Sequence, residues 1–231
     1  MEVENLQTHF KERLYHQFSR IGKCLSSDKR LEIMDVLSNG PKSVEGLANQ
    51  TGMSIANVSR HLQILLETRL VKCHRKGNYV IYSLCDPTVS QFLSSLWELS
   101  EDRLSDVKQM KEELKKQFPD VRSITKKELL LKMKEENIIL IDVRPADEYQ
   151  SSHIPNAVSV PFEQLGHYLK TLNKSEVKIV AYCRGKYCSI TSKAVDYIQK
   201  QGFTAYRIEE GIRDWNHCDE DIHLDIKPDS I

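Results

Sequence analysis

Apolar residues in the first part of the chain recur every three or four positions, which predicts short amphipathic helices. The first of these helices begins near Asp28, a suitable N-cap, and ends at the turn residues 39–41 (Asn-Gly-Pro). Its apolar face is formed by Leu31, Met34 and Leu37. Another short helix is expected over residues 43–50, before a tight break at Thr51-Gly52.

A further helix is predicted over residues 55–67, with Ser54 as its N-cap. The residues expected to face the interior are Ile55, Val58, Leu62 and Leu65. The residues expected to face solvent are Asn57, Ser59, Arg60 and Gln63. Two short helices joined through a glycine-bearing turn form a helix-turn-helix, and the second helix of such a motif can enter the major groove of DNA. Arginine can bind guanine there, and Asn or Gln can bind adenine.

Two apolar runs, residues 70–75 and 79–84, flank the basic segment 76–78 (Lys-Gly-Asn) and predict a β-hairpin. From Val58 to Cys85 the chain has five basic residues and one acidic residue, a local charge of about +4, although its formal net charge is zero. Such a patch suits contacts with DNA phosphates. The pattern alone is also compatible with a small helical domain that carries a solvated, charged hairpin.

Three segments carry a family resemblance in both order and spacing: residues 25–33, 59–65 (SRHLQIL) and 77–82 (GNYVIY). Over roughly residues 10–110 the chain resembles the ArsR-type winged-helix repressors. The resemblance implies a homodimer, built partly by terminal helices, that binds a two-fold symmetric double-stranded DNA operator and represses transcription. The residues expected at the DNA are Asn57, Ser59, Arg60, His61, Gln63, Arg75 and Lys76.

Two features bear on what this half does besides binding DNA. The helix predicted over residues 86–117 has one apolar side, which either forms the dimer interface or packs in the core of its own subunit. That side consists of Val89, Phe92, Leu93 and Leu96. Many ArsR-type proteins sense metals, but the stretch 43–48 lacks their cysteines and the stretch 86–118 lacks their histidine. We therefore expect no metal site, and we expect Cys24, Cys73 and Cys85 to be packing residues.

Strand-like runs alternate with helical segments from Val121 onward, which is typical of a parallel α/β sheet. The expected strands are residues 138–141, 177–182 and 204–208. Since a charged helical stretch ends before Pro119, the domain boundary is predicted at about 119–121. The chain should thus have two domains: a mainly α winged helix-turn-helix domain over residues 1–118, followed by an α/β domain over residues 121–231.

Cys183 stands where a predicted strand stops and a short loop turns into a helix. Backbone amides of the loop and the helix N-terminus direct positive partial charge at such a position, which lowers the pKa of a thiol and stabilises a thiolate or a persulfide anion. Arg184 and Lys186 would add positive charge. A lone cysteine at a strand end can also be a packing residue.

Several motifs accompany this cysteine in order: Asp-Val-Arg at 142–144, Glu-Tyr at 148–149, His-Ile-Pro at 153–155 and Gly-Ile-Arg-Asp-Trp at 211–215. Residues 121–218 resemble the rhodanese domain. The resemblance implies that Cys183 accepts sulfane sulfur from a donor such as thiosulfate or polysulfide. It also implies that Asp142, Arg144, Glu148 and His153 are structural. The expected active-site loop is Arg184, Gly185, Lys186, Tyr187 and Cys188.

This half departs from the rhodanese pattern at three positions. Asn156 and Glu210 stand where glycine is usual. Cys188 follows Cys183 by five residues, and it either resolves a Cys183 persulfide into a disulfide or is an inert core residue. Related Cys-dependent phosphatases need His before the cysteine and Arg six residues after it. Tyr182 and Ser189 occupy those positions, which argues against that chemistry.

The remaining features of the sequence set the cellular context. The start of the chain lacks the layout of a signal peptide, and no apolar run reaches the length of a membrane span. With six cysteines, a secreted disulfide scaffold is not expected, and we predict a cytoplasmic protein that needs no cofactor and no membrane. A zinc site of Cys183, Cys188, His217 and Cys218 would fit no familiar zinc spacing. Two hypotheses remain: a regulator that responds to sulfane sulfur or redox state, and a sulfurtransferase tethered to a DNA-binding module.

Overall fold

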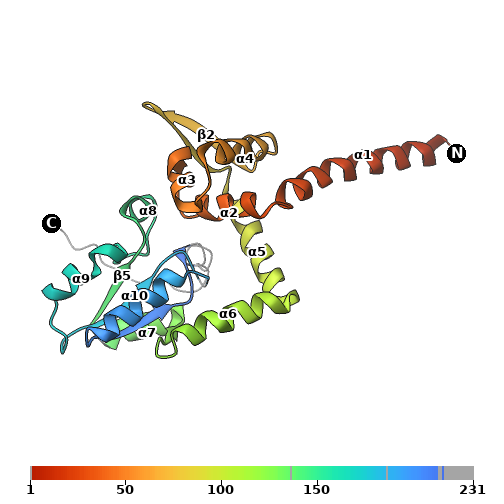
Figure 1. Ribbon diagram of the computed structural model, residues 1–231. Coiled ribbons are helices and arrows are strands. Elements are labelled where there is room, and N and C mark those ends of the chain that lie inside the picture. Colours follow the sequence, from red (N-terminus) through yellow and green to blue (C-terminus); the bar gives the residue numbers. More distant parts are fainter. Residues whose placement is uncertain (1, 136, 186, 213–214, 216–231) are drawn as a thin grey trace. The chain divides into compact units, whose positions relative to one another are not determined.

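In the computed structural model the chain forms two compact units, residues 1–103 and 104–231 (Figure 1). The structure describes residues 2–135, 137–185, 187–212 and 215. Among these residues, no helix combines the length and the apolar character that a membrane span requires.

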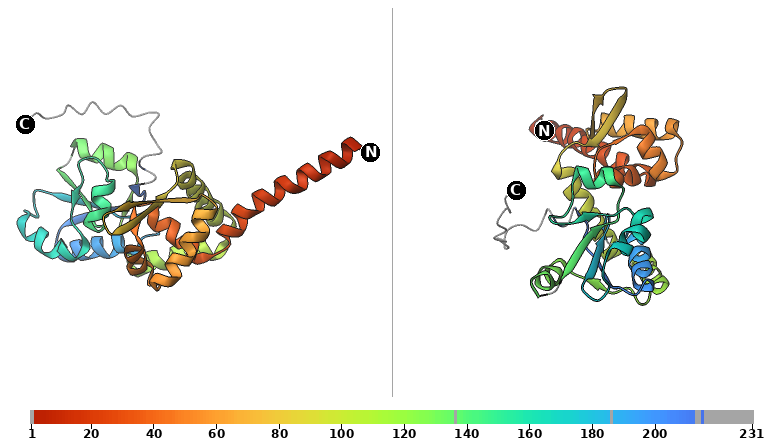
Figure 2. Two further views of the ribbon diagram at one scale, coloured as in Figure 1. Left: turned by 90° about the horizontal axis from the view of Figure 1, so that it is seen from above. Right: turned by 90° about the vertical axis from the view of Figure 1, so that its left-hand side faces the viewer.

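The first unit consists of helices and a small antiparallel sheet. The helices are α1 (Glu2–Leu25), α2 (Asp28–Leu37), α3 (Val44–Thr51), α4 (Ile55–Glu67) and α5 (Pro87–Arg103). The strands have the order β1 (Lys42–Ser43), β3 (Tyr79–Leu84), β2 (Val71–Lys76). The predicted hairpin is confirmed as β2 and β3. Strand β1 was not predicted, because a strand of two residues is too short to show an alternation of apolar and polar positions. Helix α1 extends beyond the body of this unit as a straight rod (Figures 1 and 2).

Serine residues cap the helices of the DNA-binding motif. Ser43 and Ser54 accept hydrogen bonds from backbone amides at the start of α3 and α4, which confirms Ser54 as an N-cap. For α2, however, the prediction of Asp28 as N-cap is wrong. The cap is Ser27, whose hydroxyl accepts from the amide of Arg30, and Asp28 is already the first helical residue.

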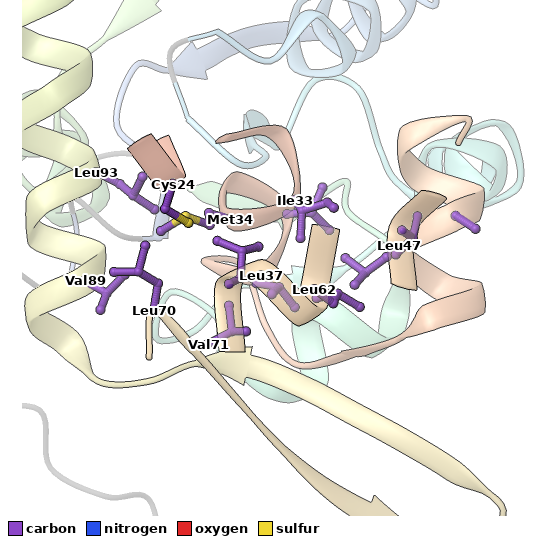
Figure 3. Close-up of a cluster of buried hydrophobic side chains, with 14 residues drawn as sticks. Cys24, Ile33, Met34, Leu37, Leu47, Leu62, Leu70, Val71, Val89 and Leu93 are labelled. Carbon is purple, nitrogen blue, oxygen red and sulfur yellow. The ribbon is translucent and has the colours of Figure 1, made fainter. Parts of the chain in front are cut away.

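The core of the first unit joins the helices and the start of the hairpin (Figure 3). Its most buried side chains are Ile33, Met34, Leu47, Val58, Leu62, Leu65 and Leu93. Three of the four apolar residues predicted on the inner side of α4 are therefore confirmed. Ile55 is wrong, because this first residue of α4 is 53% exposed and does not pack on the core.

The helix predicted over residues 86–117 is broken into α5 and α6 (Ser105–Gln117). Leu104, with φ −105° and ψ 111°, is extended and interrupts the helical hydrogen bonds. Helix α6 belongs to the second compact unit. The division into functional domains at residues 118–121 stays a prediction.

The second unit contains a five-stranded, wholly parallel sheet of the order β4-β8-β7-β5-β6. Its strands are β4 (Ser123–Ile124), β5 (Ile138–Asp142), β6 (Val158–Ser159), β7 (Lys178–Tyr182) and β8 (Thr204–Ile208). The expected strands are confirmed as β5, β7 and β8, and the two missed strands have only two residues each.

Helices cover both faces of this sheet. Helices α9 (Leu165–Tyr168) and α10 (Ser189–Lys200) pack on the face that carries Ile179, Ala181 and Cys183. Helix α7 (Lys126–Glu135) packs through Leu129 on the other face. The short helix α8 (Ala146–Ser151) follows the end of β5.

Candidate functional site

Two cysteines meet at the carboxyl end of the central strand of the parallel sheet. Cys183 follows β7 directly and is 2% exposed, and Cys188 is the N-cap residue of α10 and is partly buried. The loop between them brings their Sγ atoms to 2.9 Å, within hydrogen-bond distance, although both are free thiols. Residues 183 and 188, named the cysteine pair below, are close enough to exchange a proton or to form a bond.

Within the cysteine pair the acidic thiol is Cys188. The hydrogen bond with Cys183, together with backbone amides of Ile190, Arg184 and Thr191, lowers the pKa of Cys188 to about 6. The same hydrogen bond and burial raise the pKa of Cys183. The expectation of a depressed pKa at Cys183 is therefore wrong, because the start of α10 directs its amides at Cys188.

Arg184 adds positive charge beside Cys183, as expected, but a buried carboxylate is its direct partner. Its Nη2 and Nε atoms donate to the Glu148 carboxylate at 2.6 and 3.0 Å, and the Glu148 side chain is fully buried. Burial lowers the pKa of Arg184, but the bond to Glu148 outweighs this and the net shift is upward. Glu148 thus fixes the first residue of the loop after Cys183.

A second buried ion pair organises the end of β5. The Arg144 guanidinium donates to Asp142 at 2.6 Å and to the Ser152 carbonyl at 2.6 Å, and the side chains of the ion pair are fully buried. This geometry fits the structural role expected for both residues. His153 likewise stays local, since its ring stacks on Tyr149 with centroids 4.0 Å apart.

The segment after β8, which contains Glu210 and Gly211, contacts the loop between Cys183 and Cys188. Glu210 accepts a hydrogen bond from the amide of Lys126 at 3.2 Å and so caps α7. At Gly211 a Cβ atom would lie 2.5 Å from the Arg184 carbonyl oxygen, so the backbones are in close contact there. The Glu210 side chain, at a position where glycine is usual, is thus directed to α7.

Of the other residues in the loop between Cys183 and Cys188, the structure describes Gly185 and Tyr187. Gly185 adopts φ 133°, a conformation that favours glycine, and the Tyr187 side chain is 42% exposed. Lys186, which was expected to add charge to the loop, lies outside the described residues.

Sequence reasoning overlooked Arg207 on β8. Its side chain is 7% exposed, and Nη1 donates to the Ser192 hydroxyl at 2.8 Å. Burial lowers the pKa of Arg207, and the negative charge of Cys188 opposes that effect. The available signal was a cation in the middle of an otherwise apolar strand, Thr-Ala-Tyr-Arg-Ile.

The expected DNA-contacting residues occupy α4 and the hairpin. Asn57, Arg60 and Gln63 are exposed, as predicted, and Ser59 and His61 are partly buried. Burial, Arg30 and Arg60 lower the pKa of His61. Arg75 and Lys76 are exposed at the end of β2. The structure thus presents polar side chains on one helix and two cations on the hairpin of the same unit.

No group of three or more potential metal ligands comes together within the part of the chain that the structure describes. His217 and Cys218 of the conceivable zinc set fall outside that part.

Two family models match this chain in separate segments. The model of bacterial regulatory proteins of the arsR family matches residues 27–72, and the model of the rhodanese-like domain matches residues 125–218. The first match runs from the residue before α2 into the start of β2, and the second begins just after β4 and ends three residues past the Gly-Ile-Arg-Asp-Trp motif.

Similar proteins are found for the whole chain and for each segment. The HTH-type transcriptional regulator Rv0324 of Mycobacterium tuberculosis is 34% identical over 209 residues, which cover 90% of this chain and 91% of the relative. The thiosulfate sulfurtransferase GlpE of Coxiella burnetii is 32% identical over 36% of this chain and 76% of its own length. A solution structure of the homodimeric winged helix-turn-helix domain of Mb0332 from Mycobacterium bovis is 31% identical, with a TM-score of 0.40 over 42% of this chain and 89% of that one.

Proposed function

Since this chain belongs to the ArsR-type transcriptional regulators that carry a rhodanese-like domain, we propose that sulfane sulfur arriving at the cysteine pair changes the affinity of the protein for its DNA operator. The observation that carries this proposal is the 2.9 Å separation of the Cys183 and Cys188 sulfurs. In the proposed scheme the regulator is a repressor, and the sulfur state of the pair sets how much of it occupies DNA.

Operator recognition is assigned to α4 and the hairpin. The exposed side chains of Asn57, Arg60 and Gln63 are able to bind base edges in the major groove, and Arg75 and Lys76 are suited to phosphates. Ser59 and His61 lie on the same helix and add contacts at its flank. Because the hairpin and α4 belong to one compact unit, both sets of contacts are presented together.

Homodimerisation is part of the proposal, and the exposed apolar residues of α1 and α5 support it. On α1, Phe10, Tyr15 and Phe18 are 59–67% exposed. On α5, Val89 and Leu93 are buried in the core of their own unit, but Phe92 is 45% exposed. Large exposed side chains of this kind are typical of protein interfaces. A second copy of the chain is the partner that we assign to them.

Sulfur loading would begin on Cys183, the position that carries sulfur in rhodanese domains. Because the pair shares one proton across 2.9 Å, transfer of that proton to Cys188 gives a Cys183 thiolate without any change of net charge. This thiolate attacks the outer sulfur of thiosulfate, forms a persulfide and releases sulfite. The backbone amide of Arg184, which bonds to Cys183, stabilises the resulting anion.

The proposal is tested by titrating one operator with three forms of the protein. The operator is a duplex selected from a random library by the reduced wild-type chain. The three forms are the reduced protein, the polysulfide-treated protein, and Cys188→Ser treated in the same way. We expect treatment to weaken operator binding about 5–150-fold in the wild type, the range of a coupling of about 1–3 kcal/mol.

Cys188→Ser should keep the affinity of the reduced protein after treatment. Equal affinity of all three forms would overturn the regulatory proposal. Similarity to GlpE makes sulfur transfer by a tethered rhodanese-like domain the second candidate. Steady turnover of thiosulfate with unchanged operator affinity would favour that candidate.

A further inference from the structure

Arg207 approaches the cysteine pair from the neighbouring strand of the sheet. Strands β7 and β8 run parallel, and Arg207 lies opposite Ala181, two residues before Cys183. Side chains alternate along a strand, so Ala181 and Cys183 share one face, as do Ala205 and Arg207. Ala181, Cys183 and Ala205 all belong to the core beneath α10. Arg207 therefore extends from the same face of the sheet as Cys183.

The guanidinium of Arg207 is anchored in the first turn of α10. Its Nη1 atom donates to Oγ of Ser192 at 2.8 Å, and Ser192 follows Cys188 by four residues, about one helical turn. The Arg207 side chain thus reaches the same end of the helix that carries the acidic thiol. With 7% exposure, this cation has lost most of its hydration and depends on nearby negative charge.

Three groups interact favourably with the charge of Arg207: the thiolate of Cys188, the carboxylate of Glu209 and, more weakly, Cys183. Burial lowers the pKa of Arg207, and the Cys188 charge opposes this effect more strongly than the Glu209 charge does. Arg184 faces the pair from the loop, but it is bound to Glu148 at 2.6 Å.

We propose that Arg207 is a positioning residue of the sulfur site, which holds Cys188 as the thiolate that attacks a persulfide on Cys183. The attack itself rests on the function proposed above. The charge relation between Arg207 and Cys188 exists without any sulfur donor, so the two parts can fail separately.

The step that Arg207 assists starts from a persulfide anion on Cys183 and a protonated Cys188. The proton moves from Cys188 to the outer sulfur, and the new Cys188 thiolate attacks the inner sulfur. A Cys183–Cys188 disulfide bond forms, the bond between the two sulfurs of the persulfide breaks, and hydrosulfide leaves. The two thiols are oxidised together by two electrons, and the sulfane sulfur supplied by the donor is reduced to hydrosulfide.

The first experiment measures the pH dependence of Cys188 alkylation by iodoacetamide in the reduced full-length chain, with peptide mass spectrometry to separate the cysteines. For the wild type we expect a midpoint near the pKa of about 6. Arg207→Gln should move this midpoint upward by about 1 unit or more, because it removes an opposite charge from a buried site. Arg207→Lys keeps the positive charge, so its midpoint should lie close to that of the wild type.

Lys193→Gln is the matched control, since it removes an exposed cation from the same helix and should leave the midpoint unchanged. Near-ultraviolet circular dichroism verifies that each variant is folded, and Arg207→Met replaces Arg207→Gln if the latter does not fold. An unchanged midpoint in the neutral variant would overturn the proposal. Equal shifts in the neutral variant and in Arg207→Lys would also overturn it, because a purely structural role gives no rescue by charge.

The second experiment loads the protein with sodium tetrasulfide, removes excess reagent, and follows hydrosulfide release together with disulfide formation. We expect release to be about tenfold slower or more in Arg207→Gln than in the wild type and to recover in Arg207→Lys, given the loss of thiolate at Cys188. A wild type that gains no sulfur on either cysteine would contradict the proposed function. The alkylation midpoints would still decide the role of Arg207.

Discussion

The Glu148 carboxylate accepts two hydrogen bonds, of 2.6 and 3.0 Å, from the Arg184 guanidinium at the start of the loop that joins Cys183 to Cys188. Glu148 is 1% exposed, and Arg184 is one-fifth exposed. A charge pair of this kind fixes geometry more than it adds net stability, because both groups have lost hydration. Removing one partner is costly, since it leaves the other charge without compensation.

Glu148→Gln should therefore destabilise the second unit by about 2–4 kcal/mol. The measurement is urea unfolding followed by the fluorescence of Trp215 in a Trp97→Phe background. Lys200→Gln is the control: it breaks the exposed Lys200–Asp196 pair at 2.7 Å and should change stability by less than about 0.5 kcal/mol. Equal effects of both changes would mean that the buried pair does not hold the loop.

Arg60→Ala tests the assignment of α4 as the recognition helix. Arg60 is exposed on the polar side of α4, and loss of a two-pronged contact with guanine should cost about 1–3 kcal/mol of binding and relax the choice of sequence. Binding to the selected operator and to single-base variants measures both effects. Unchanged affinity and unchanged sequence preference would show that another element reads the bases.

Lys76→Ala tests whether the hairpin contacts the DNA backbone rather than the bases. Lys76 ends β2 and is exposed, which suits a phosphate contact. Its removal should weaken all duplexes alike and reduce the slope of binding against salt by about 1. A change in base preference in this variant would contradict its assignment to the DNA backbone.

The sequence predicted well what repeats along the chain. Apolar periodicity located α4, which buries one side, and apolar runs located β5, β7 and β8, which are buried along most of their length. The hairpin was located as well, although its strands are largely exposed. The break at Leu104 was not predictable in this way, since the residues on both sides of it favour helices. Strands of two residues, such as β4, are too short to show a period.

At the cysteine pair, the chain order pointed to Cys183 as a candidate residue but not to the charges around it. The partner of Arg184 is Glu148, 36 residues away, and the pairing depends on how α8 packs at the end of β5. The charge of Arg207 acts on Cys188 because β8 lies beside β7 in the sheet. Contacts between segments far apart in sequence place these two cations, and no local pattern encodes them.

Replacing Cys183 separates hydrogen bonding from the other influences on Cys188. The hydrogen bond with Cys183 is the largest contribution that lowers the pKa of Cys188 to about 6. Cys183→Ala removes this donor, so the pKa should rise and the pH at which Cys188 is half-alkylated should move upward. Cys183→Ser retains a hydroxyl donor and should stay closer to the wild type. Identical midpoints for the alanine and serine variants would show that the bond between the pair does not control ionisation.

Gly211→Ala tests whether the segment after β8 fixes the loop of the cysteine pair. The added Cβ would lie 2.5 Å from the Arg184 carbonyl oxygen and 2.8 Å from the Cα of Gly185, and both neighbours are backbone atoms. Relief requires the loop to move, at a cost of about 1–3 kcal/mol.

We expect this variant to remain folded but to alkylate Cys188 with a midpoint above pH 6 or so, because displaced amides no longer support the thiolate. Gly166→Ala is the matched control. Its Cβ would meet only the hydroxyl end of the Tyr197 side chain at 2.9 Å, and that side chain is 38% exposed and can turn away. If Gly211→Ala has the same stability and the same alkylation midpoint as Gly166→Ala, the loop of the cysteine pair keeps its conformation without the close contact at Gly211.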